Sequence, residues 1–348
     1  MEVKCPSACR KLGITPRSRE EISVNIVGAE NVHRLLDYPG LIEALADAHC
    51  RDRPLNTRVL FETPDEAGGS GEGFLVLPAW APGRAFGAKL VTLMPTNDEV
   101  LTGLPTIQAV FVLFDGKTGS PRAIIDGTSL TLRKTAADSA LGARLLARED
   151  AHTLLMVGAG ALAPHLIRAH RIARPSIERV FLWNRTTPRR AAVIDRLGRE
   201  GLTVEPSDDL ETAVRVADIV CTATRATEPL IRGAWLKAGT HVDLVGSYIP
   251  ALREADDEAI SRASVFVDFR GPCVKEAGDL AQPIAAGVIG EDDVLADLFE
   301  LARGDHHGRS AVDEVTLFKN GGGGHLDLFT AEYLIQRRDA EVNTAAPD

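Results

Sequence analysis

A glycine-rich turn between an apolar strand and an amphipathic helix constrains the fold more than any other feature of this sequence. The strand at 153–157 is followed by Gly158-Ala-Gly160-Ala-Leu-Ala163 and by a helical pattern that runs to residue 173. In a dinucleotide-binding turn the first glycine permits a sharp bend, the second lets a pyrophosphate approach the backbone, and the helix N-terminus stabilises the anion. Ala163 is small enough for close helix packing at the third position. The turn predicts a dinucleotide site; the alternative is a flavodoxin-like glycine turn that binds no nucleotide. The expected cofactor contacts are Gly158, Gly160, Ala161 and Leu162.

Strands and helices alternate from residue 153 to residue 302. The strands carry apolar residues on both faces, which is typical of a parallel sheet covered by helices on each side. We therefore predict a Rossmann-type, doubly wound α/β domain over residues 136–317, entered through a helix at 134–148. Its other expected strands are 179–183, 202–205, 218–222, 241–245 and 265–268, and its other expected helices are 187–197, 210–216, 255–262 and 292–302.

The N-terminal part has a different pattern, with short strands separated by turn residues. These strands are rich in β-branched and aromatic residues and predict an antiparallel sheet that curls into a half-barrel. A helical pattern at 32–49 precedes them, so this domain is α+β. After residue 315 come a strand-like run, four glycines and a closing helix, which we expect to return to this domain. The expected substrate-binding and dimerisation domain is therefore 1–135 with 318–348. The expected strands are 57–61, 74–77, 86–93, 107–113 and 121–126.

Composition limits the classes of function. The 348-residue chain has a net charge of −10, which argues against a nucleic-acid partner. No apolar run approaches the roughly 20 residues that cross a bilayer, and residues 1–21 have no apolar centre of a secretion signal, so no membrane partner is expected. Five scattered cysteines fit reduced thiols in the cytoplasm. Cys5 and Cys9 have no second ligand pair at zinc spacing, and His165 and His170 have no apparent third ligand, so no metal site is expected.

The end of the second strand of the expected Rossmann domain bears on the choice of coenzyme. NAD-binding proteins carry an acidic residue here that hydrogen-bonds the adenosine ribose, whereas this chain has Asn184-Arg185-Thr186. A carboxylate repels a 2′-phosphate, while a guanidinium pairs with it and Thr186 can donate a hydroxyl. We predict NADPH as the cofactor, with NADH weaker, and contacts at Asn184, Arg185 and Thr186. The alternative is that Arg185 is a solvated loop charge.

Several motifs in a fixed order resemble the ornithine cyclodeaminase/mu-crystallin family. The resemblance implies a homodimer formed through the N-terminal sheet, an active site between the two domains, and chemistry at the carbon that bears nitrogen in amino and imino acids. It also implies cofactor contacts at Thr106, Thr222, Thr224, Gly246 and Asn320. The motifs are Thr131-Leu-Arg-Lys-Thr-Ala-Ala-Asp-Ser139, Gly158-Ala-Gly160, Ala217-Asp-Ile-Val-Cys-Thr-Ala-Thr224, Val245-Gly-Ser-Tyr-Ile-Pro250 with Arg253-Glu254, and Phe318-Lys-Asn320.

The resemblance further implies that Arg58 and Lys89 hold the substrate carboxylate and serve in catalysis. A planar guanidinium fits a carboxylate, and a lysine in a half-buried strand is costly without an anion. The alternatives are an ion pair of Lys89 with an acidic side chain and a plain loop position for Arg58. Where the family has Arg before Thr-Ala-Ala, this chain has Lys134, with Arg133 one place earlier. Either one is a candidate contact to the substrate carboxylate or to a cofactor phosphate.

A second departure from the family bears on the reaction. Cyclodeaminases carry a catalytic Asp in a Gly-x-Asp-x-Pro loop, whereas this chain has Gly246-Ser-Tyr248-Ile-Pro250. Cyclodeamination needs a positioned acid and base for several proton transfers, and tyrosine, with an ordinary pKa of about 10, is poorly suited to that role at neutral pH. Reduction of an imine needs less: a protonated C=N, a hydride and a clamp for the carboxylate. The loop therefore favours imine reduction, with Tyr248 as a substrate contact.

The segment Lys319-Asn-Gly-Gly-Gly-Gly324-His325 resembles the form in bacterial Δ1-pyrroline-2-carboxylate and Δ1-piperideine-2-carboxylate reductases. Four glycines let the backbone approach a ligand closely, which makes Gly322 and His325 candidate substrate contacts; the alternative is a flexible linker. His325 and Asp327 are candidate proton sources, or structural residues at the start of a helix.

Together these features predict NADPH-dependent reduction of cyclic α-imino acids, from Δ1-pyrroline-2-carboxylate to L-proline and from Δ1-piperideine-2-carboxylate to L-pipecolate. One alternative is an ornithine cyclodeaminase or an alanine-type amino-acid dehydrogenase. The other is a crystallin-like protein that binds NADPH and a small ligand without turnover.

Overall fold

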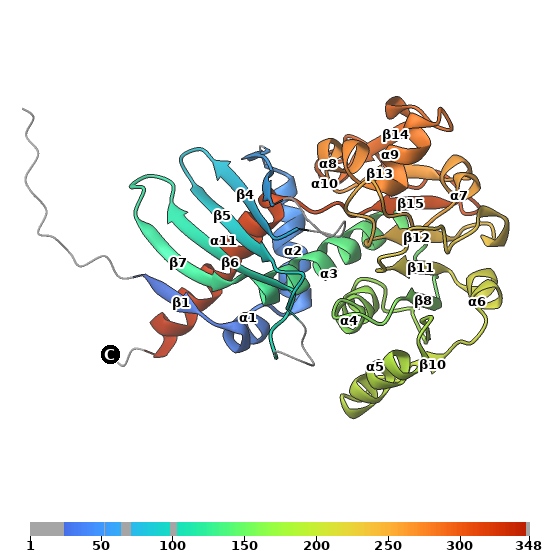
Figure 1. The fold of residues 1–348 in the computed structure, drawn as a ribbon, viewed down its shortest axis with the longest axis horizontal. Coiled ribbons are helices and arrows are strands. Elements are labelled where there is room, and N and C mark those ends of the chain that lie inside the picture. The colour runs from blue at the N-terminus through green and yellow to red at the C-terminus, as the bar shows by residue number, and fades with distance from the viewer. Residues whose placement is uncertain (1–23, 52, 64–70, 98–102, 346–348) are drawn as a thin grey trace, which may run out of the picture.

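The chain folds around two β-sheets, here called sheet A and sheet B, which lie side by side in the molecule (Figure 1). The computed structural model describes residues 24–51, 53–63, 71–97 and 103–345. The expectations for residues 1–21, including those for Cys5 and Cys9, lie outside the described residues. Among the helices of the described part, none is both long and apolar enough to span a membrane.

Sheet A is mainly antiparallel, as the N-terminal pattern predicted, with the order β1-β7-β6-β5-β4-β2 and β3 also paired to β4. Its strands are β1 (Asn25–Val27), β2 (Leu55–Asn56), β3 (Val59–Glu62), β4 (Gly73–Ala81), β5 (Ala85–Leu93), β6 (Ile107–Asp115) and β7 (Pro121–Asp126). The helices α3 (Gly127–Leu146) and α11 (Gly324–Ala345) pack on one face of it (Figure 1). On β5, Gly87, Lys89 and Val91 are buried because alternate side chains point toward these helices.

The N-terminal helical segment forms two helices where the spacing predicted a single one at 32–49. α1 (Ala29–Leu35) ends before Asp37, whose carboxylate accepts a hydrogen bond of 2.8 Å from the first turn of α2 (Tyr38–His49). A second acidic cap, Asp126, starts α3 earlier than the expected residue 134. Helix starts thus follow the acidic caps more closely than the apolar spacing.

Sheet B is entirely parallel, with the strand order β10-β9-β8-β11-β12-β15-β13-β14 and helices between its strands, which confirms the predicted doubly wound α/β fold. Its strands are β8 (Thr153–Val157), β9 (Arg179–Trp183), β10 (Glu205–Pro206), β11 (Ile219–Thr222), β12 (His241–Leu244), β13 (Ser264–Val267), β14 (Val294–Asp297) and β15 (Thr316–Lys319). The helices associated with it are α4 (Ala163–Ala173), α5 (Thr187–Arg199), α6 (Leu210–Val216), α7 (Asp257–Arg262), α8 (Arg270–Lys275), α9 (Gly278–Ala285) and α10 (Leu298–Arg303).

The segment expected as one helix at 292–302 was predicted wrongly, because it is strand β14 followed by helix α10. Asp297 separates the two elements. Its carboxylate accepts hydrogen bonds from the first turn of α10, and the Glu300 side chain accepts one from the Asp297 N–H at 2.8 Å. This reciprocal cap ends the strand and begins the helix within one residue. Apolar spacing over so few residues does not distinguish the two states.

The C-terminal segment belongs to both sheets. β15 lies between β12 and β13 in sheet B, whereas α11 packs against sheet A. The chain therefore passes from one sheet to the other at residues 320–323, and the boundary expected at 317/318 falls inside β15. The first crossing between the sheets is α3, which contacts strands of both.

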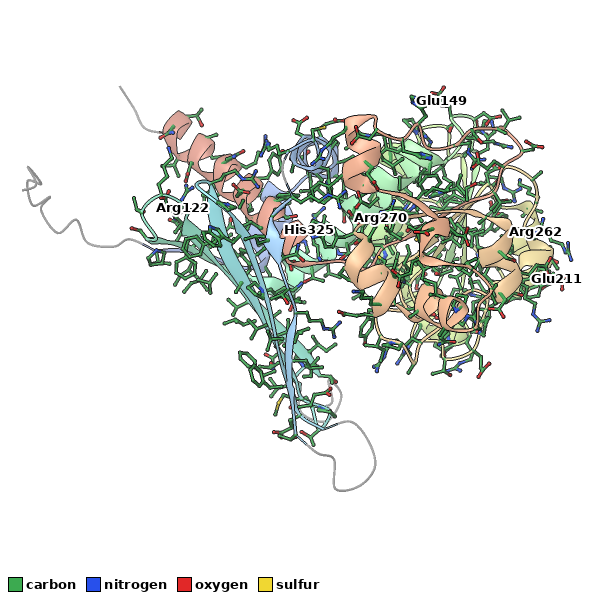
Figure 2. All side chains as sticks on the ribbon, turned by 90° about the horizontal axis from the view of Figure 1, so that it is seen from above. Arg122, Glu149, Glu211, Arg262, Arg270 and His325 are labelled. Carbon is green, nitrogen blue, oxygen red and sulfur yellow. The ribbon has the colours of Figure 1, made fainter. Side chains whose placement is uncertain are left out.

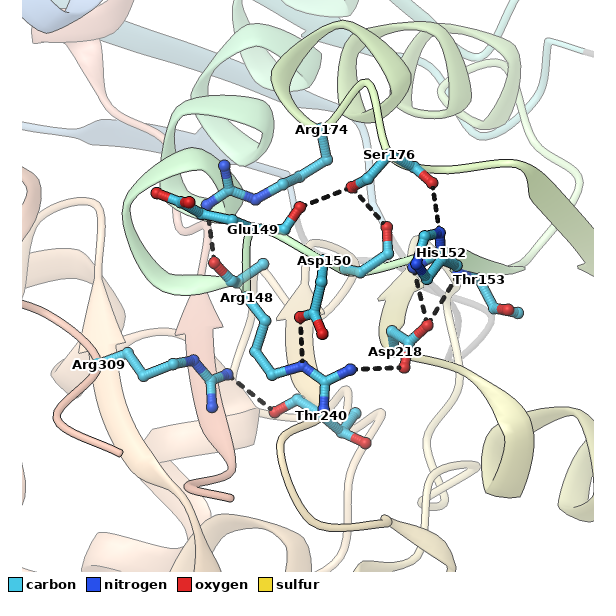
Figure 3. Close-up of polar contacts among 12 residues, drawn as sticks. Arg148, Glu149, Asp150, His152, Thr153, Arg174, Ser176, Asp218, Thr240 and Arg309 are labelled. Carbon is cyan, nitrogen blue, oxygen red and sulfur yellow. Dashed lines mark hydrogen bonds and ion pairs between the residues drawn. The ribbon is translucent and has the colours of Figure 1, made fainter. Parts of the chain in front are cut away.

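A polar network fastens the amino-terminal edge of sheet B (Figure 3). The Asp218 carboxylate accepts hydrogen bonds of 2.9 Å from the backbone N–H groups of His152 and Thr153, where β8 begins. Arg148, just after α3, lies 3.2 Å from the same carboxylate. These contacts fix the start of the sheet and leave its carboxyl-terminal edge for ligands, as is usual for open α/β sheets.

Candidate functional site

All the predicted cofactor residues except Thr106 lie along the carboxyl-terminal edge of sheet B. The strand register places Thr222 beside Val157 on one side and beside Leu244 on the other, and Leu244 beside Lys319. The loops that follow these strands begin with Gly158, Ala223, Val245 and Asn320, so they meet at one edge of the sheet.

The glycine-rich turn has the geometry that a pyrophosphate needs. Gly158 has a φ of +108°, and a Cβ there would lie 2.5 Å from the carbonyl oxygen of Ala223, so only glycine fits. Gly160 has open space at its Cβ position, and both it and Ala161 are exposed. Within the described residues, the backbone N–H groups of Gly160, Ala161 and Leu162 donate to no protein acceptor. Three free donors at a helix N-terminus form an anion site.

The loop after β9 supports the glycine-rich turn and exposes the Arg185 guanidinium. The Asn184 side-chain oxygen accepts a hydrogen bond of 3.1 Å from Ala159 N–H, and its amide donates to the Thr186 carbonyl at 2.9 Å. Asn184 therefore holds the two loops together. Arg185 and Thr186 are exposed, and among the described residues the Arg185 guanidinium has no hydrogen-bond or ion-pair partner. It is free to meet a phosphate.

The side chains of Thr222 and Thr224 turn toward the protein interior. The buried Glu254 carboxylate accepts hydrogen bonds of 2.7 to 2.8 Å from both hydroxyls, from Thr224 N–H and from Gly246 N–H. Thr222, Thr224 and Gly246 thus lie at the carboxyl-terminal edge of sheet B, but their polar groups bind Glu254. The family motif contains this glutamate, yet sequence reasoning missed that it ties the loops after β11 and β12 together.

Two other predicted cofactor contacts also bind protein groups. The amide of Asn320 is buried and donates to the Thr135 carbonyl and to Ser139 Oγ, both at 3.1 Å, so it fastens the end of β15 to α3. The Thr106 hydroxyl donates to the carbonyl of Asn97 at 3.2 Å. In the described part of the chain, Thr106 makes no contact with the glycine-rich turn.

A buried cluster of opposite charges lies where α3 and α11 meet sheet A. Lys89 projects from β5, Lys134 and Thr131 from one face of α3, and Asp327 from the first turn of α11. Lys89 Nζ donates to Asp327 Oδ1 at 3.0 Å and to Thr131 Oγ1 at 3.3 Å, and lies 2.9 Å from Asp327 Oδ2. Lys134 Nζ lies 3.6 Å from Asp327 Oδ1. The alternative considered for Lys89, an ion pair with an acidic side chain, is therefore present, and Lys134 shares the same carboxylate.

The charge cluster has unused hydrogen-bond donors. An ammonium group has three N–H donors. Lys89 uses two of them, and within the described residues the Lys134 ammonium group donates no hydrogen bond. Burial lowers the pKa of Lys89 to about 8, the Asp327 charge opposing this effect and the Lys134 charge adding to it. Two buried ammonium groups with one carboxylate leave a positive charge for which an anionic ligand is the natural partner.

Arg58 and Arg133, two further predicted substrate contacts, each bind other protein groups. Arg58 follows β2 and forms an ion pair of 3.0 Å with Glu276, at the end of α8, so it spans the two parts of the molecule. Arg133 points away from Lys89: its guanidinium donates to the carbonyl and ring of His33 and lies 4.8 Å from the centre of the Tyr38 ring. Since neighbouring helix residues face different directions, Lys134 and not Arg133 belongs to the cluster.

The remaining predicted substrate contacts are placed as follows. His325 lies at the junction of the two parts of the molecule (Figure 2). It is fully buried, and its ring contacts those of His49, Phe269 and Phe299. Burial lowers the pKa of His325 well below its usual value, so the ring is neutral and far from a solvent proton source. Tyr248 is 40% exposed, on the loop after β12.

Gly322 adopts a φ of +70°, and its N–H donates to the Asp268 carboxylate at 2.6 Å. A Cβ at this position would lie 3.3 Å from Lys134 Nζ, so the glycine segment passes directly beside the charge cluster.

Sequence reasoning also missed Asp138, one helical turn after Lys134. Both of its oxygens are buried without a hydrogen bond, and burial with the nearby Asp268 charge raises its pKa well above the usual value.

One set of potential metal ligands does come together. His170, Cys221 and Asp243 each place a ligand atom within 4.8 Å of the others, so neighbouring strands supply the further ligands that the sequence did not reveal for His170. Asp243 already accepts hydrogen bonds from Cys221 Sγ at 3.1 Å and from Ser139 Oγ at 3.0 Å. Because protein donors occupy the carboxylate, the geometry of this cluster does not require an ion.

Comparison with known proteins decides the family. The model of the ornithine cyclodeaminase/mu-crystallin family matches residues 51–341. The chain belongs to this family. A Delta(1)-pyrroline-2-carboxylate reductase of Paracoccus denitrificans is 45% identical over 256 residues, which cover 74% of this chain and 80% of that protein.

Solved structures of family-like proteins agree with the fold. That of Thermococcus litoralis Delta(1)-pyrroline-2-carboxylate reductase in complex with NADH and L-proline has a TM-score of 0.84 and 27% identity, and the match covers 92% of this chain and 98% of that one. An archaeal alanine dehydrogenase dimer with bound NAD has a TM-score of 0.82 and 25% identity, with 92% and 97% covered. The predicted membership of the ornithine cyclodeaminase/mu-crystallin family and the predicted fold are both confirmed.

Proposed function

We propose that this protein is an NADPH-dependent reductase of cyclic α-imino acids that converts Δ1-pyrroline-2-carboxylate to L-proline and Δ1-piperideine-2-carboxylate to L-pipecolate. The observation that carries the proposal is the pair of buried ammonium groups, Lys89 and Lys134, with unused donors around the single carboxylate of Asp327. Such a site suits one substrate carboxylate. Relatives named as Delta(1)-pyrroline-2-carboxylate reductases support the choice of substrate.

In this proposal the residues of the chain bind and orient the substrate. Lys89 and Lys134 hold its carboxylate, and Arg58 approaches from the loop after β2. The imine nitrogen arrives protonated, so the ring carbon attached to the carboxylate is electrophilic. A bound dihydronicotinamide supplies the hydride to that carbon. Fixing both reactants at one edge, with their charges matched, provides most of the rate enhancement. Gly322, beside Lys134, and Tyr248, on the exposed loop after β12, are the proposed further substrate contacts, whereas the buried His325 acts through packing.

NADPH is the proposed coenzyme because the loop after β9 offers an exposed guanidinium and hydroxyl in place of a carboxylate. Arg185 and Thr186 are exposed, and Asn184 ties their loop to the glycine-rich turn. NADH, which has no 2′-phosphate, gains nothing from Arg185 and is proposed as the weaker coenzyme.

We also propose a homodimer formed through sheet A. The face of sheet A opposite α3 and α11 is apolar: Phe74, Trp80 and Ile124 are 41%, 50% and 39% exposed, and Phe86 and Phe114 stack there at 5.1 Å. A cavity of about 590 Å³ lies beside Trp80 and Phe86. A contiguous exposed apolar face of this kind is typical of a protein interface. The domain at 1–135 with 318–348 then binds substrate and dimerises, the domain at 136–317 binds coenzyme, and the cytoplasm is the proposed compartment.

One assay separates the proposal from its alternatives. NADPH oxidation is followed with Δ1-pyrroline-2-carboxylate, Δ1-piperideine-2-carboxylate, and pyruvate plus ammonia as separate substrates. Rapid oxidation with the cyclic imines alone supports the proposal. Turnover of pyruvate plus ammonia, or release of ammonia from ornithine, would instead indicate an amino-acid dehydrogenase or a cyclodeaminase. Binding of NADPH without oxidation of any substrate would indicate a crystallin-like binding protein.

A further inference from the structure

Asp327 is more deeply buried than the two lysines of the charge cluster. It is fully buried, and its carboxylate lies 2.9 to 3.0 Å from Lys89 Nζ and 3.6 Å from Lys134 Nζ. Since no part of Asp327 is exposed, it cannot touch a substrate in this conformation. Its influence on the reaction has to pass through the lysines.

We propose that Asp327 is a positioning residue that keeps Lys89 in its ammonium form and aims the one N–H that Asp327 and Thr131 leave free toward the substrate. The role of that N–H rests on the function proposed above. The protonation of Lys89 does not, because it follows from the groups around the nitrogen.

The polar groups that face Lys89 come from two helices. Asp327 approaches from α11, and Thr131 and Lys134 approach from α3. On the neighbouring strands, the residues paired with Lys89 are the apolar Leu77 and Phe111. Asp327 is therefore the one anion among them. Burial and Lys134 lower the pKa of Lys89, and only Asp327 raises it. Without the Asp327 charge, both remaining effects favour the neutral amine.

The backbone fixes Asp327 in this position. Gly324, where α11 begins, is so close to β4 that a Cβ would lie 2.8 Å from the carbonyl oxygen of Pro78. Glycine thus allows the helix start to press against sheet A, three residues before the carboxylate. An acidic residue in the first turn of a helix is also stabilised as an anion by the helix dipole. The start of α11 therefore places the Asp327 carboxylate directly against Lys89.

The test measures the titration of Lys89 directly. The chain has eight lysines, so protein labelled with ¹³C at lysine Cε gives few NMR signals, and the signal lost in Lys89→Met identifies Lys89. The midpoint of this signal is compared between the wild-type protein and Asp327→Asn. The expected result is a midpoint lower by about one pH unit or more in Asp327→Asn. Asp327→Glu, which keeps the charge, returns the midpoint toward the wild-type value.

A matched control is Asp339→Asn, which removes an exposed acid from the same helix, where it pairs with Arg122 at 3.2 Å. It leaves the Lys89 midpoint unchanged. If Asp327→Asn does not fold, Asp327→Ser replaces it, because serine is small and favours helix starts. The same Lys89 midpoint in wild type and in the neutral variant overturns the inference.

A second readout is the affinity of the NADPH-loaded protein for L-proline, which binds without turnover. As the pH rises, Lys89 loses its proton and the affinity for L-proline falls. Titration calorimetry is expected to show that this fall begins at a lower pH in Asp327→Asn than in wild type. Wild-type protein that neither binds L-proline nor reduces the cyclic imines refutes the proposed function, while the NMR titration still decides the role of Asp327.

Discussion

The Arg58 guanidinium lies 3.0 Å from the Glu276 carboxylate, and this ion pair bridges the two parts of the molecule between the loop after β2 and the end of α8. Both side chains are partly exposed, so the pair is open to exchange. A substrate carboxylate that binds Arg58 has to compete with Glu276. The Arg58–Glu276 ion pair therefore weakens substrate binding, because it has to break before Arg58 can bind the carboxylate.

This competition predicts that Glu276→Gln binds substrate more tightly. Removing the competing charge frees Arg58, and the KM for Δ1-pyrroline-2-carboxylate is expected to fall about threefold, with kcat little changed. Steady-state kinetics with saturating NADPH measure this. Glu291→Gln, at an exposed turn, is the control. An unchanged or raised KM in Glu276→Gln would show that Arg58 does not hold the substrate.

Lys89→Ala is expected to lose at least about a hundredfold in kcat/KM for the imino acid, because the substrate carboxylate then loses a buried cation. NADPH binding, followed by fluorescence titration, should change little, since Lys89 lies on β5 and the glycine-rich turn follows β8. Lys117→Met, in the exposed turn after β6, serves as the control. Equal losses in turnover and in NADPH binding would contradict the role assigned to Lys89.

Arg185→Ala should raise the KM for NADPH about tenfold and leave that for NADH unchanged, because only NADPH carries the phosphate that the guanidinium pairs with. The comparison of both coenzymes at a fixed imine concentration is the measurement. Arg199→Ala, at the far end of α5, should alter neither value. An unchanged NADPH KM in Arg185→Ala would mean that this arginine is only a solvated loop charge.

Glu254→Gln is expected to destabilise the protein by about 3 kcal/mol, because a carboxylate accepts all four of its hydrogen bonds whereas an amide nitrogen would face two buried donors. Thermal unfolding monitored by circular dichroism gives the change. Glu258→Gln, which weakens an exposed pair with Arg262 on α7, is the control and should cost little. Equal stability of the two variants would show that Glu254 does not stabilise the loops after β11 and β12.

Trp80→Glu should convert a dimer to a monomer, because a charge in the middle of the exposed apolar face of sheet A opposes its burial. Sedimentation velocity at micromolar concentration measures the change in mass. Ile172→Glu, on an exposed position of α4, should leave the mass unaltered. A wild-type protein that sediments as a monomer would refute the proposed dimer directly.

Local patterns in the sequence predicted much of the fold. The turn at Gly158 and the apolar strands before and after it were enough for the parallel sheet, because each signal spans only a few residues. The short segment at 292–302 was assigned wrongly because its spacing suits a helix, and the capping role of Asp297 was not recognised.

The candidate site was only partly predictable. Lys89 and Asp327 lie 238 positions apart in the chain, and nothing local to either residue reveals their contact. To choose between Arg133 and Lys134, one has to know which side of α3 faces the charge cluster. The residue types alone do not determine this. Thr222 and Thr224 lie at the sheet edge, but the direction of their hydroxyls depends on Glu254, which is 32 and 30 residues later in the chain.

The chain crosses between its two sheets twice, once along α3 and once through the glycine segment at 320–323. Lys134 lies on the first of these connecting segments, and Asp327 lies in the first turn of the helix that follows the second. The same two segments that join the sheets therefore also assemble the charge cluster, so inserting or deleting a residue in either segment would shift one charge relative to the other.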